Sequence, residues 1–193
     1  MVDTWMIDVP GERVLVRELG PADEAPLLRL FEECEDWFTA ATGLPSAPGD
    51  VQSLFYALPE GAHPDDKVLL VLERDGVVAG VVDAVRDHPG PGAVAVGLFL
   101  LAPWARGRGL GRALAEALLS RAGDAAEVTA TVPPGWRPGE RFLERLGFAL
   151  DPEPRPTGAN RRTGPREGGV RRAVLRRDAA TRRSPSRGPG PTG

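Results

Sequence analysis

The chain has 193 residues, of which 41% are hydrophobic and 26% are charged, proportions that are ordinary for a globular protein. A single cysteine excludes an internal disulfide, and the cysteine and two histidines are too few for a metal cluster. Because no stretch approaches the roughly 20 apolar residues of a membrane span and the first residues do not form a secretory signal, we expect a cytoplasmic protein without a membrane partner.

Charge is unevenly distributed along the chain. Residues 1–150 contain 23 acidic and 13 basic side chains, whereas residues 151–193 contain 11 arginines and 4 acidic residues. An arginine-rich end can bind nucleic acid. However, residues 178–193 are rich in proline, glycine and serine and contain no aromatic residue that could stack on a base. We therefore expect one folded domain over residues 1–177 followed by a disordered tail, and we disfavour nucleic acid as a partner.

Hydrophobic periodicity in the first half of the chain predicts a strand, a helix and a hairpin. The strand is expected at residues 13–19, and the helix at residues 21–38, where apolar side chains recur on one face. Two β-rich runs within residues 67–87 flank Asp75-Gly76, which is a strong signal for a tight turn between antiparallel strands.

Alternation of strands and helices continues in the second half. Residues 93–101 are almost continuously apolar, which predicts a strand buried on both faces in the middle of a sheet. The elements expected after it are a helix at 110–122, a strand at 127–132, a helix at 139–148 and a strand at 170–177. This order predicts an α/β fold in which helices flank one mixed sheet.

The segment RGRGLG, residues 106–111, connects the apolar strand to the next helix. A helix N-terminus presents N–H groups without helical partners and a partial positive charge, so it attracts anions. The three glycines remove Cβ atoms that would keep a phosphate away from these N–H groups, and the two arginines add positive charge. The pattern predicts a phosphate site, with a ligand-free glycine turn as the alternative. Neither a Walker loop nor the dinucleotide fingerprint GxGxxG fits this spacing.

The sequence ARGRGLGRAL resembles the acyl-coenzyme A signature of the GNAT N-acetyltransferases, with Arg106, Gly109 and Gly111 at its defining positions. Residues 141–148, RFLERLGF, resemble a second segment of that family. The resemblance implies a mostly antiparallel sheet with a splay between its fourth and fifth strands, here the predicted strands that end at Leu101 and Val132, in which acetyl-coenzyme A (acetyl-CoA) binds. It implies cofactor contacts at the end of the apolar strand and at the glycine corner: Leu100, Leu101, Arg106, Gly107, Arg108, Gly109, Leu110, Gly111 and Arg112.

Two features depart from the family pattern. Leu143 stands where the family commonly has a tyrosine that protonates the leaving thiolate, and residues 93–101 lack the glutamate that some members keep on this strand. General acid catalysis typically contributes a factor of about 10² to 10⁴, yet an alkyl thiol with a pKa of roughly 8.5 is a tolerable leaving group. We therefore expect a slower or differently assisted transfer. Tyr56, the only tyrosine, is a candidate replacement acid, with packing in the core as the alternative.

An acceptor amine must lose a proton before it attacks a thioester, so a base or a desolvating pocket is needed. The ionisable candidates are Asp83, Asp87, His88, Glu32, Glu33, Glu35 and Asp36. We select Asp36 and Asp83 as candidate catalytic residues; for the acidic cluster the alternative is a solvated helix face, and for His88 it is a loop residue without a catalytic role. The candidate substrate-binding wall combines acids with aromatic rings: Glu35, Asp36, Trp37 and Tyr56. Cys34 falls on the apolar stripe, which favours a core residue over an acyl carrier.

The resemblance thus implies an acyltransferase that moves an acetyl group from acetyl-CoA to an amine by direct attack, without a metal. The acidic first 150 residues favour a cationic acceptor, either a small molecule or a peptide amine. An alternative is a non-catalytic acyl-CoA sensor, because the usual acid is missing. The sequence leaves open the acceptor, the acyl-chain length and the choice between a monomer and a homodimer.

Overall fold

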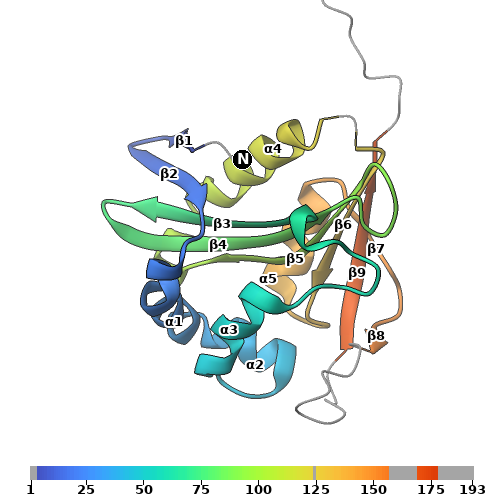
Figure 1. The fold of residues 1–193 in the computed structure, drawn as a ribbon, viewed down its shortest axis with the longest axis horizontal. Coiled ribbons are helices and arrows are strands. Elements are labelled where there is room, and N and C mark those ends of the chain that lie inside the picture. The colour runs from blue at the N-terminus through green and yellow to red at the C-terminus, as the bar shows by residue number, and fades with distance from the viewer. Residues whose placement is uncertain (1–3, 124, 157–168, 178–193) are drawn as a thin grey trace, which may run out of the picture.

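The computed structural model describes residues 4–123, 125–156 and 169–177. The predicted tail, residues 178–193, lies outside these residues. The strands form a mixed sheet in the order β1-β2-β3-β4-β5-β6-β9-β7, and β8 pairs with β9 (Figure 1). Their bounds are β1 (Trp5–Val9), β2 (Glu12–Glu18), β3 (Lys67–Arg74), β4 (Val77–Arg86), β5 (Ala93–Leu101), β6 (Glu127–Val132), β7 (Ala149–Leu150), β8 (Arg155–Pro156) and β9 (Gly169–Arg176).

The sheet is mostly antiparallel, as predicted. Among the described strands, β5 and β6 form the only parallel pair, and the other neighbours run antiparallel. The turn between β3 and β4 confirms the predicted hairpin, because Asp75 and Gly76 both have positive φ angles, 51° and 78°. Such a pair of left-handed residues gives a turn whose twist matches that of the flanking strands.

Helices cover both faces of the sheet. Their bounds are α1 (Glu24–Glu33), α2 (Glu35–Thr42), α3 (Pro48–Tyr56), α4 (Leu110–Arg121) and α5 (Arg137–Arg145), with 3-10 turns at Pro21–Asp23, Pro64–Asp66 and Pro103–Ala105. Figure 1 shows α1, α2 and α3 on one side of the sheet and α4 on the other. Fully buried side chains fill the space between these layers, among them Leu27 and Phe31 of α1 and Leu110 and Leu114 of α4.

The predicted helix at residues 21–38 is wrong as one continuous element. The chain forms a 3-10 turn and then α1, which ends at Cys34, a residue with φ −97° and ψ 30°, before α2 begins. The Cys34 thiol donates a hydrogen bond to Leu101 O at 3.4 Å, so the break is anchored on the end of β5. The change of direction brings Phe38 of α2 against Phe31 of α1, with ring centroids 4.8 Å apart.

Several short elements were not predicted. Strand β1 precedes the first predicted strand and pairs with it as a hairpin, while α3 occupies the loop region between α2 and β3. Strands β7 and β8 have two residues each, too few for a periodic pattern. Strand β1 extends one edge of the sheet, β7 and β8 pair with β9 near the opposite edge, and α3 lies on the face that holds α1.

Candidate functional site

The glycine corner joins β5 to α4. After Leu101 the chain makes the 3-10 turn Pro103–Ala105 and enters α4 at Leu110, with Gly109 as the N-cap residue. Gly107 and Gly109 have φ angles of 79° and 88°, in the left-handed region where glycine is favoured. A Cβ atom at either position would meet no atom of the described residues within 4 Å. The corner therefore has open space on the side where side chains would otherwise project.

The first turn of α4 supplies backbone amides to this corner. Ala113 N donates to Gly109 O at 3.0 Å, which is the bond that opens the helical ladder. The amides of Leu110, Gly111 and Arg112 precede this bond, and the helix dipole adds a partial positive charge there. The Leu110 side chain is buried, at 1% exposure, and fixes the start of the helix in the core. This arrangement is suited to an anion.

Gly111 is required by close packing. A Cβ atom there would lie 3.2 Å from Leu101 Cδ1 and 3.4 Å from Phe142 Cε2. The absent side chain allows α4 to approach both β5 and α5, which places the helix N-terminus close to the end of β5.

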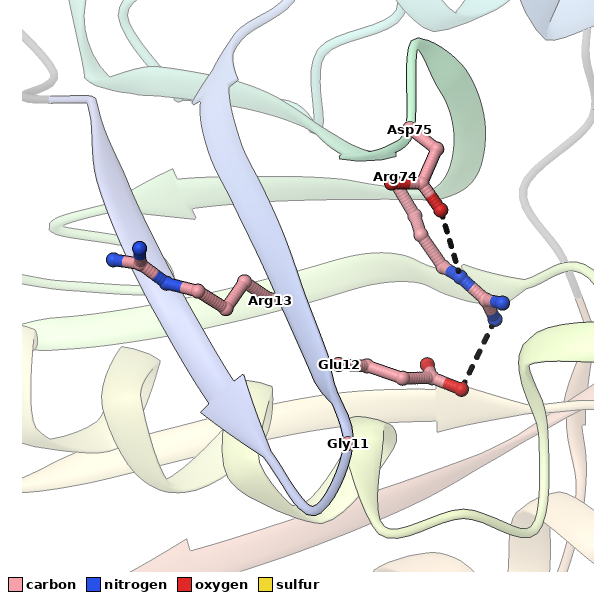
Figure 2. Close-up of a pocket in the computed structure, with 5 residues that line it drawn as sticks. All are labelled: Gly11, Glu12, Arg13, Arg74 and Asp75. Carbon is pink, nitrogen blue, oxygen red and sulfur yellow. Dashed lines mark ion pairs between the residues drawn. The ribbon is translucent and has the colours of Figure 1, made fainter.

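Arginine side chains of the corner have carboxylate partners within the chain. Arg108 Nη1 donates to Glu12 Oε1, and Arg112 Nε donates to Glu116 Oε1, both at 2.7 Å. Glu12 also pairs with Arg74 at 3.1 Å and lines a small pocket of about 160 Å³ at the ends of two hairpins (Figure 2). Because these pairs offset part of the predicted positive charge, the backbone amides are the feature of the corner that is best suited to an anion.

Strands β5 and β6 separate before they end. They pair in parallel at four positions, of which the last joins Val96 to Ala130. Beyond it β5 continues to Leu101 and β6 to Val132. The structure thus contains the splay that the family resemblance implies, and the glycine corner lies at the end of the splayed part of β5.

A β-bulge marks the start of the splay. Between β4 and β5, Asp83 lies opposite Leu98 and Ala84 lies opposite Val96, so Gly97 is the extra residue. Gly97 is exposed, and a Cβ atom there would lie 3.9 Å from both O and Oδ2 of Asp83. The predicted burial of β5 on both faces is wrong for its first seven residues, of which Gly97 is exposed and the other six are half-buried.

Arg106 reaches away from the corner toward α2. Its Nη1 donates to Asp36 Oδ2 at 2.6 Å, its Nη2 donates to Asp36 Oδ1 at 3.2 Å, and its Nε donates to Leu101 O at 2.8 Å. The guanidinium carbon also lies 5.8 Å from the centroid of the Trp136 ring, a cation–π distance. One side chain therefore links the end of β5, the start of α2 and the loop between β6 and α5.

Cys34 completes this cluster as a buried thiol. Arg106 Nη2 approaches its Sγ at 3.4 Å. Burial raises the pKa of Cys34 to about 11, and Arg106 opposes this rise only in part. Cys34 is fully buried in the core, as predicted, and its thiol is neutral at physiological pH.

Asp36 is held by Arg106 through both of its carboxylate oxygens. The hydrogen bonds from Arg106 lower the pKa of Asp36, although partial burial acts in the opposite direction. A carboxylate stabilised in its charged form is a weaker proton acceptor than a free one. The structure therefore brings Asp36 together with Arg106 and Trp136, and its catalytic role stays a prediction.

Asp83 lies beside the bulge and is paired with Lys67. Lys67 Nζ is 3.0 Å from both carboxylate oxygens of Asp83 and 2.6 Å from the carbonyl oxygen of Ala57 at the end of α3. The side chain of Lys67 is 9% exposed and that of Asp83 is 16% exposed. Burial raises the pKa of Asp83, and Lys67 opposes this rise. Of the two predicted carboxylates, Asp83 is the one whose pKa lies above its ordinary value, and its catalytic role also stays a prediction.

The other predicted wall residues lie along α2 and α3. Glu35 is exposed, and the half-buried Trp37 packs edge-on against Phe38 with centroids 5.0 Å apart. Tyr56 is 84% exposed, so its alternative as a core residue is wrong. Leu143 is buried, which makes the position of the family tyrosine part of the core.

Two of the other candidate bases hold nearby backbone or side-chain donors. Asp87 Oδ1 accepts a hydrogen bond from Gly92 N at 2.7 Å, which shapes the turn before β5. Glu33 Oε2 accepts a hydrogen bond from Trp104 Nε1 at 2.9 Å and so ties α1 to the turn that follows β5.

Sequence reasoning missed Lys67 and Glu12. Lys67 is the only lysine in the chain, a signal that could have drawn attention to it. Glu12 contacts Arg108 across 96 positions of sequence, a separation that no local pattern can reveal.

Neither a metal cluster nor a membrane span is found in the part of the chain that the structure describes. No group of three or more histidine, cysteine, aspartate or glutamate side chains there could hold a metal ion. None of the described helices combines the length and the apolar character that crossing a bilayer requires.

Comparison with protein families matches residues 29–148 to the acetyltransferase (GNAT) family. Among solved structures, the chain is similar to an acetyltransferase from Thermus thermophilus, with 18% identity, a TM-score of 0.64 and coverage of 89% of this chain and 99% of the other. It is also similar to the GNAT domain of S. lividans PAT, with 19% identity, a TM-score of 0.63 and coverage of 90% and 96%. A GCN5-related N-acetyltransferase from Kribbella flavida shares 23% identity, with a TM-score of 0.58 and coverage of 84% and 97%. No match was found among curated protein sequences.

Proposed function

Because the chain belongs to the GNAT acetyltransferase family, we propose that it transfers an acetyl group from acetyl-CoA to an acceptor amine by direct attack. The observation that supports this proposal most strongly is the open glycine corner at the end of the splayed strand β5. The corner offers amides to a diphosphate, and the splay leaves part of the β5 edge free of β6.

The residues of the corner fit the phosphate part of the cofactor. Amides between Arg106 and Arg112 would hold the diphosphate, helped by the dipole of α4. Backbone groups near Leu100 and Leu101 would pair with the amides of the pantetheine arm, as an added strand does. The side chains of Arg108 and Arg112 already have carboxylate partners, so the backbone would provide most of the contact.

When bound, acetyl-CoA supplies an activated thioester, and a side chain beside the splay would accept the proton of the acceptor amine. Asp83 would accept the proton from the acceptor amine as its nitrogen forms a bond to the acetyl carbon and the carbon–sulfur bond breaks. A backbone N–H near Leu101 would stabilise the oxyanion. The thiolate would take its proton from water, because Leu143 cannot donate one.

The acceptor would approach from the side of α1, α2 and α3, where Asp83 lies. Exposed groups there include the carboxylate of Glu35 and the ring of Tyr56, and both can contact a cationic amine. Trp37 and Asp36 would complete this wall. A cationic small molecule or a peptide amine is the acceptor class that these groups favour.

Two measurements test this proposal. Thermal denaturation with acetyl-CoA, free CoA and NAD should show stabilisation by the first two ligands only. Release of CoA from acetyl-CoA is then followed with a panel of amines, peptides and aminoglycosides, where an acceptor should raise the rate. Stabilisation without release for every acceptor would support the acyl-CoA sensor, and absence of stabilisation would refute the cofactor assignment itself.

A further inference from the structure

Lys67, the only lysine in the chain, uses all three of its ammonium protons on the acceptor side of the sheet. Its Nζ donates to both oxygens of Asp83 at 3.0 Å and to the carbonyl oxygen of Ala57 at 2.6 Å. Lys67 begins β3, Asp83 lies in β4 and Ala57 is the C-cap residue of α3, so the ammonium joins three elements. Side-chain exposure of 9% at Lys67 leaves little contact with solvent.

The chemistry of this site favours an ammonium over a guanidinium. Three acceptor atoms lie around one nitrogen, which matches a compact point charge with three donors. The planar fork of arginine directs its donors outward from a larger group and would need more space. The chain has 23 arginines, and its one lysine stands at a position whose geometry suits an ammonium better than a guanidinium.

The carboxylate that Lys67 holds lies at the opening of the splay. Asp83 Oδ2 is 3.9 Å from the position of a Cβ atom on Gly97, the exposed bulge residue. In the described part of the chain, the charged group that acts on Asp83 is the Lys67 ammonium from β3, whose third hydrogen bond goes to the Ala57 carbonyl. The strand neighbours of Asp83 are uncharged: Leu69 of β3, and Gly97 and Leu98 of β5. Helix α1 packs on this face through apolar side chains such as Leu27.

We propose that Lys67 is a positioning residue of the acetyl transfer, which keeps the Asp83 carboxylate ionised and fixed beside Gly97 so that it can take the proton of the acceptor amine. This inference rests on the proposed function, because it assigns Lys67 a role through the base of that reaction. Without the ammonium, burial would favour the protonated acid, which cannot accept a proton. Lys67 thus permits a buried base to remain charged at neutral pH.

Three variants test the proposal: Lys67→Met, Asp83→Asn and the double variant. The pH profile of CoA release is measured with the best acceptor of the panel, and the titration of Asp83 is followed by NMR of ¹³C-labelled aspartate, with the signal assigned by its loss in Asp83→Asn. In Lys67→Met, the Asp83 midpoint and the acid limb of the rate profile should both move to higher pH. Each unit of that shift lowers the rate on the acid limb about tenfold.

The double variant separates positioning from a structural role. Asp83→Asn should lower the rate by about 10²-fold or more, the usual contribution of a general base. Adding Lys67→Met in that background should cause no further loss, because Lys67 acts through Asp83. The double variant also removes both charges together, which avoids an unpaired buried carboxylate if Lys67→Met alone does not fold. Arg17→Met is the matched control, because it removes the cation from a different buried carboxylate, Asp23, and should leave the pH profile unchanged.

The outcomes distinguish this inference from the proposed function. If wild-type protein releases CoA and the Asp83 midpoint and rate profile are unchanged in Lys67→Met, the role of Lys67 is refuted while acetyl transfer stands. A further rate loss of about tenfold or more from Lys67→Met in the Asp83→Asn background would also refute it. If wild-type protein releases no CoA with any acceptor, the proposed function fails, whether or not Lys67 controls the titration of Asp83.

Discussion

Replacing Gly109 with alanine tests the glycine corner directly. Gly109 has a φ angle of 88°, and a non-glycine residue in the left-handed region costs about 1–2 kcal/mol. The added Cβ atom meets no atom of the described residues within 4 Å, so we expect no steric cost within the protein. A cost of 1 kcal/mol lowers the melting temperature of a chain of this size by about 2–4 °C.

The same methyl group should interfere with a phosphate, because it projects into the open side of the corner. A hydrogen bond to a charged group contributes about 1.5–3 kcal/mol, so loss of one amide contact weakens binding roughly 10- to 100-fold. At an acetyl-CoA concentration of 100 times the wild-type Kd, the ligand stabilises wild-type protein by about 2.7 kcal/mol. In Gly109→Ala this stabilisation should fall to between about 0.4 and 1.4 kcal/mol.

Gly123 provides the matched control at the opposite end of α4. It has a φ angle of 58°, and its Cβ position is 4.0 Å from the nearest atom, Arg121 O. Gly123→Ala therefore carries a similar strain without altering the corner. Thermal denaturation of wild type and both variants, with and without acetyl-CoA, should show similar losses of stability for both variants but a reduced ligand effect for Gly109→Ala alone. An undiminished ligand effect in Gly109→Ala would refute the phosphate assignment.

Three further predictions concern the fold that supports the site. Glu140 is 4% exposed and accepts a hydrogen bond from Arg171 at 2.8 Å. Glu140→Gln should lower the free energy of unfolding, measured by urea denaturation, by about 3 kcal/mol. A loss below about 1 kcal/mol would show that this buried pair does not hold α5 to β9. Hydrogen bonds from Arg17 lower the pKa of Asp23, so their stabilisation is present above the ordinary carboxyl pKa of about 3.9 and is lost as pH falls through the lower folded value. Arg17→Met should therefore reduce the urea midpoint at pH 7 and flatten its decline toward acid pH, whereas an unchanged acid slope would contradict this linkage. Cys34, with its pKa raised to about 11 by burial, should react with a thiol reagent at pH 8 only after unfolding, and rapid reaction of native protein would contradict its place in the core.

Local sequence patterns predicted the parts of the site that are local in the chain. The glycine corner and the start of α4 lie within six residues, where spacing and backbone geometry are directly related. The hairpin at Asp75-Gly76 was predictable for the same reason. The break at Cys34 was not, because the contact that the structure places there, from the thiol to Leu101 O, spans 67 positions. Apolar residues keep their helical spacing through the break, so the sequence pattern predicts one continuous helix.

Partners of the charged side chains could not be predicted for a related reason. The two candidate catalytic residues, Asp36 and Asp83, are carboxylates, and each acquires its proton affinity from groups that the fold brings to it. Asp36 accepts a hydrogen bond from Arg106, which is 70 positions away in the sequence, and Asp83 accepts one from Lys67, which is 16 positions away on the neighbouring strand. Sequence spacing identified which residues could titrate, whereas the environment of each one required the structure.

Pairing of these two carboxylates has a consequence for the acceptor amine. A carboxylate without a partner would raise the pKa of a nearby amine and hold it as an ammonium, which cannot attack a thioester. At Asp36 and Asp83 that effect is reduced, because Arg106 and Lys67 supply opposite charge at hydrogen-bond distance. The acidic surface of the chain would attract a cation from solution, where screening extends over about 8–10 Å. Paired charges at the splay would then release the amine in its neutral, reactive form, so attraction and activation of the acceptor would be assigned to different parts of the protein.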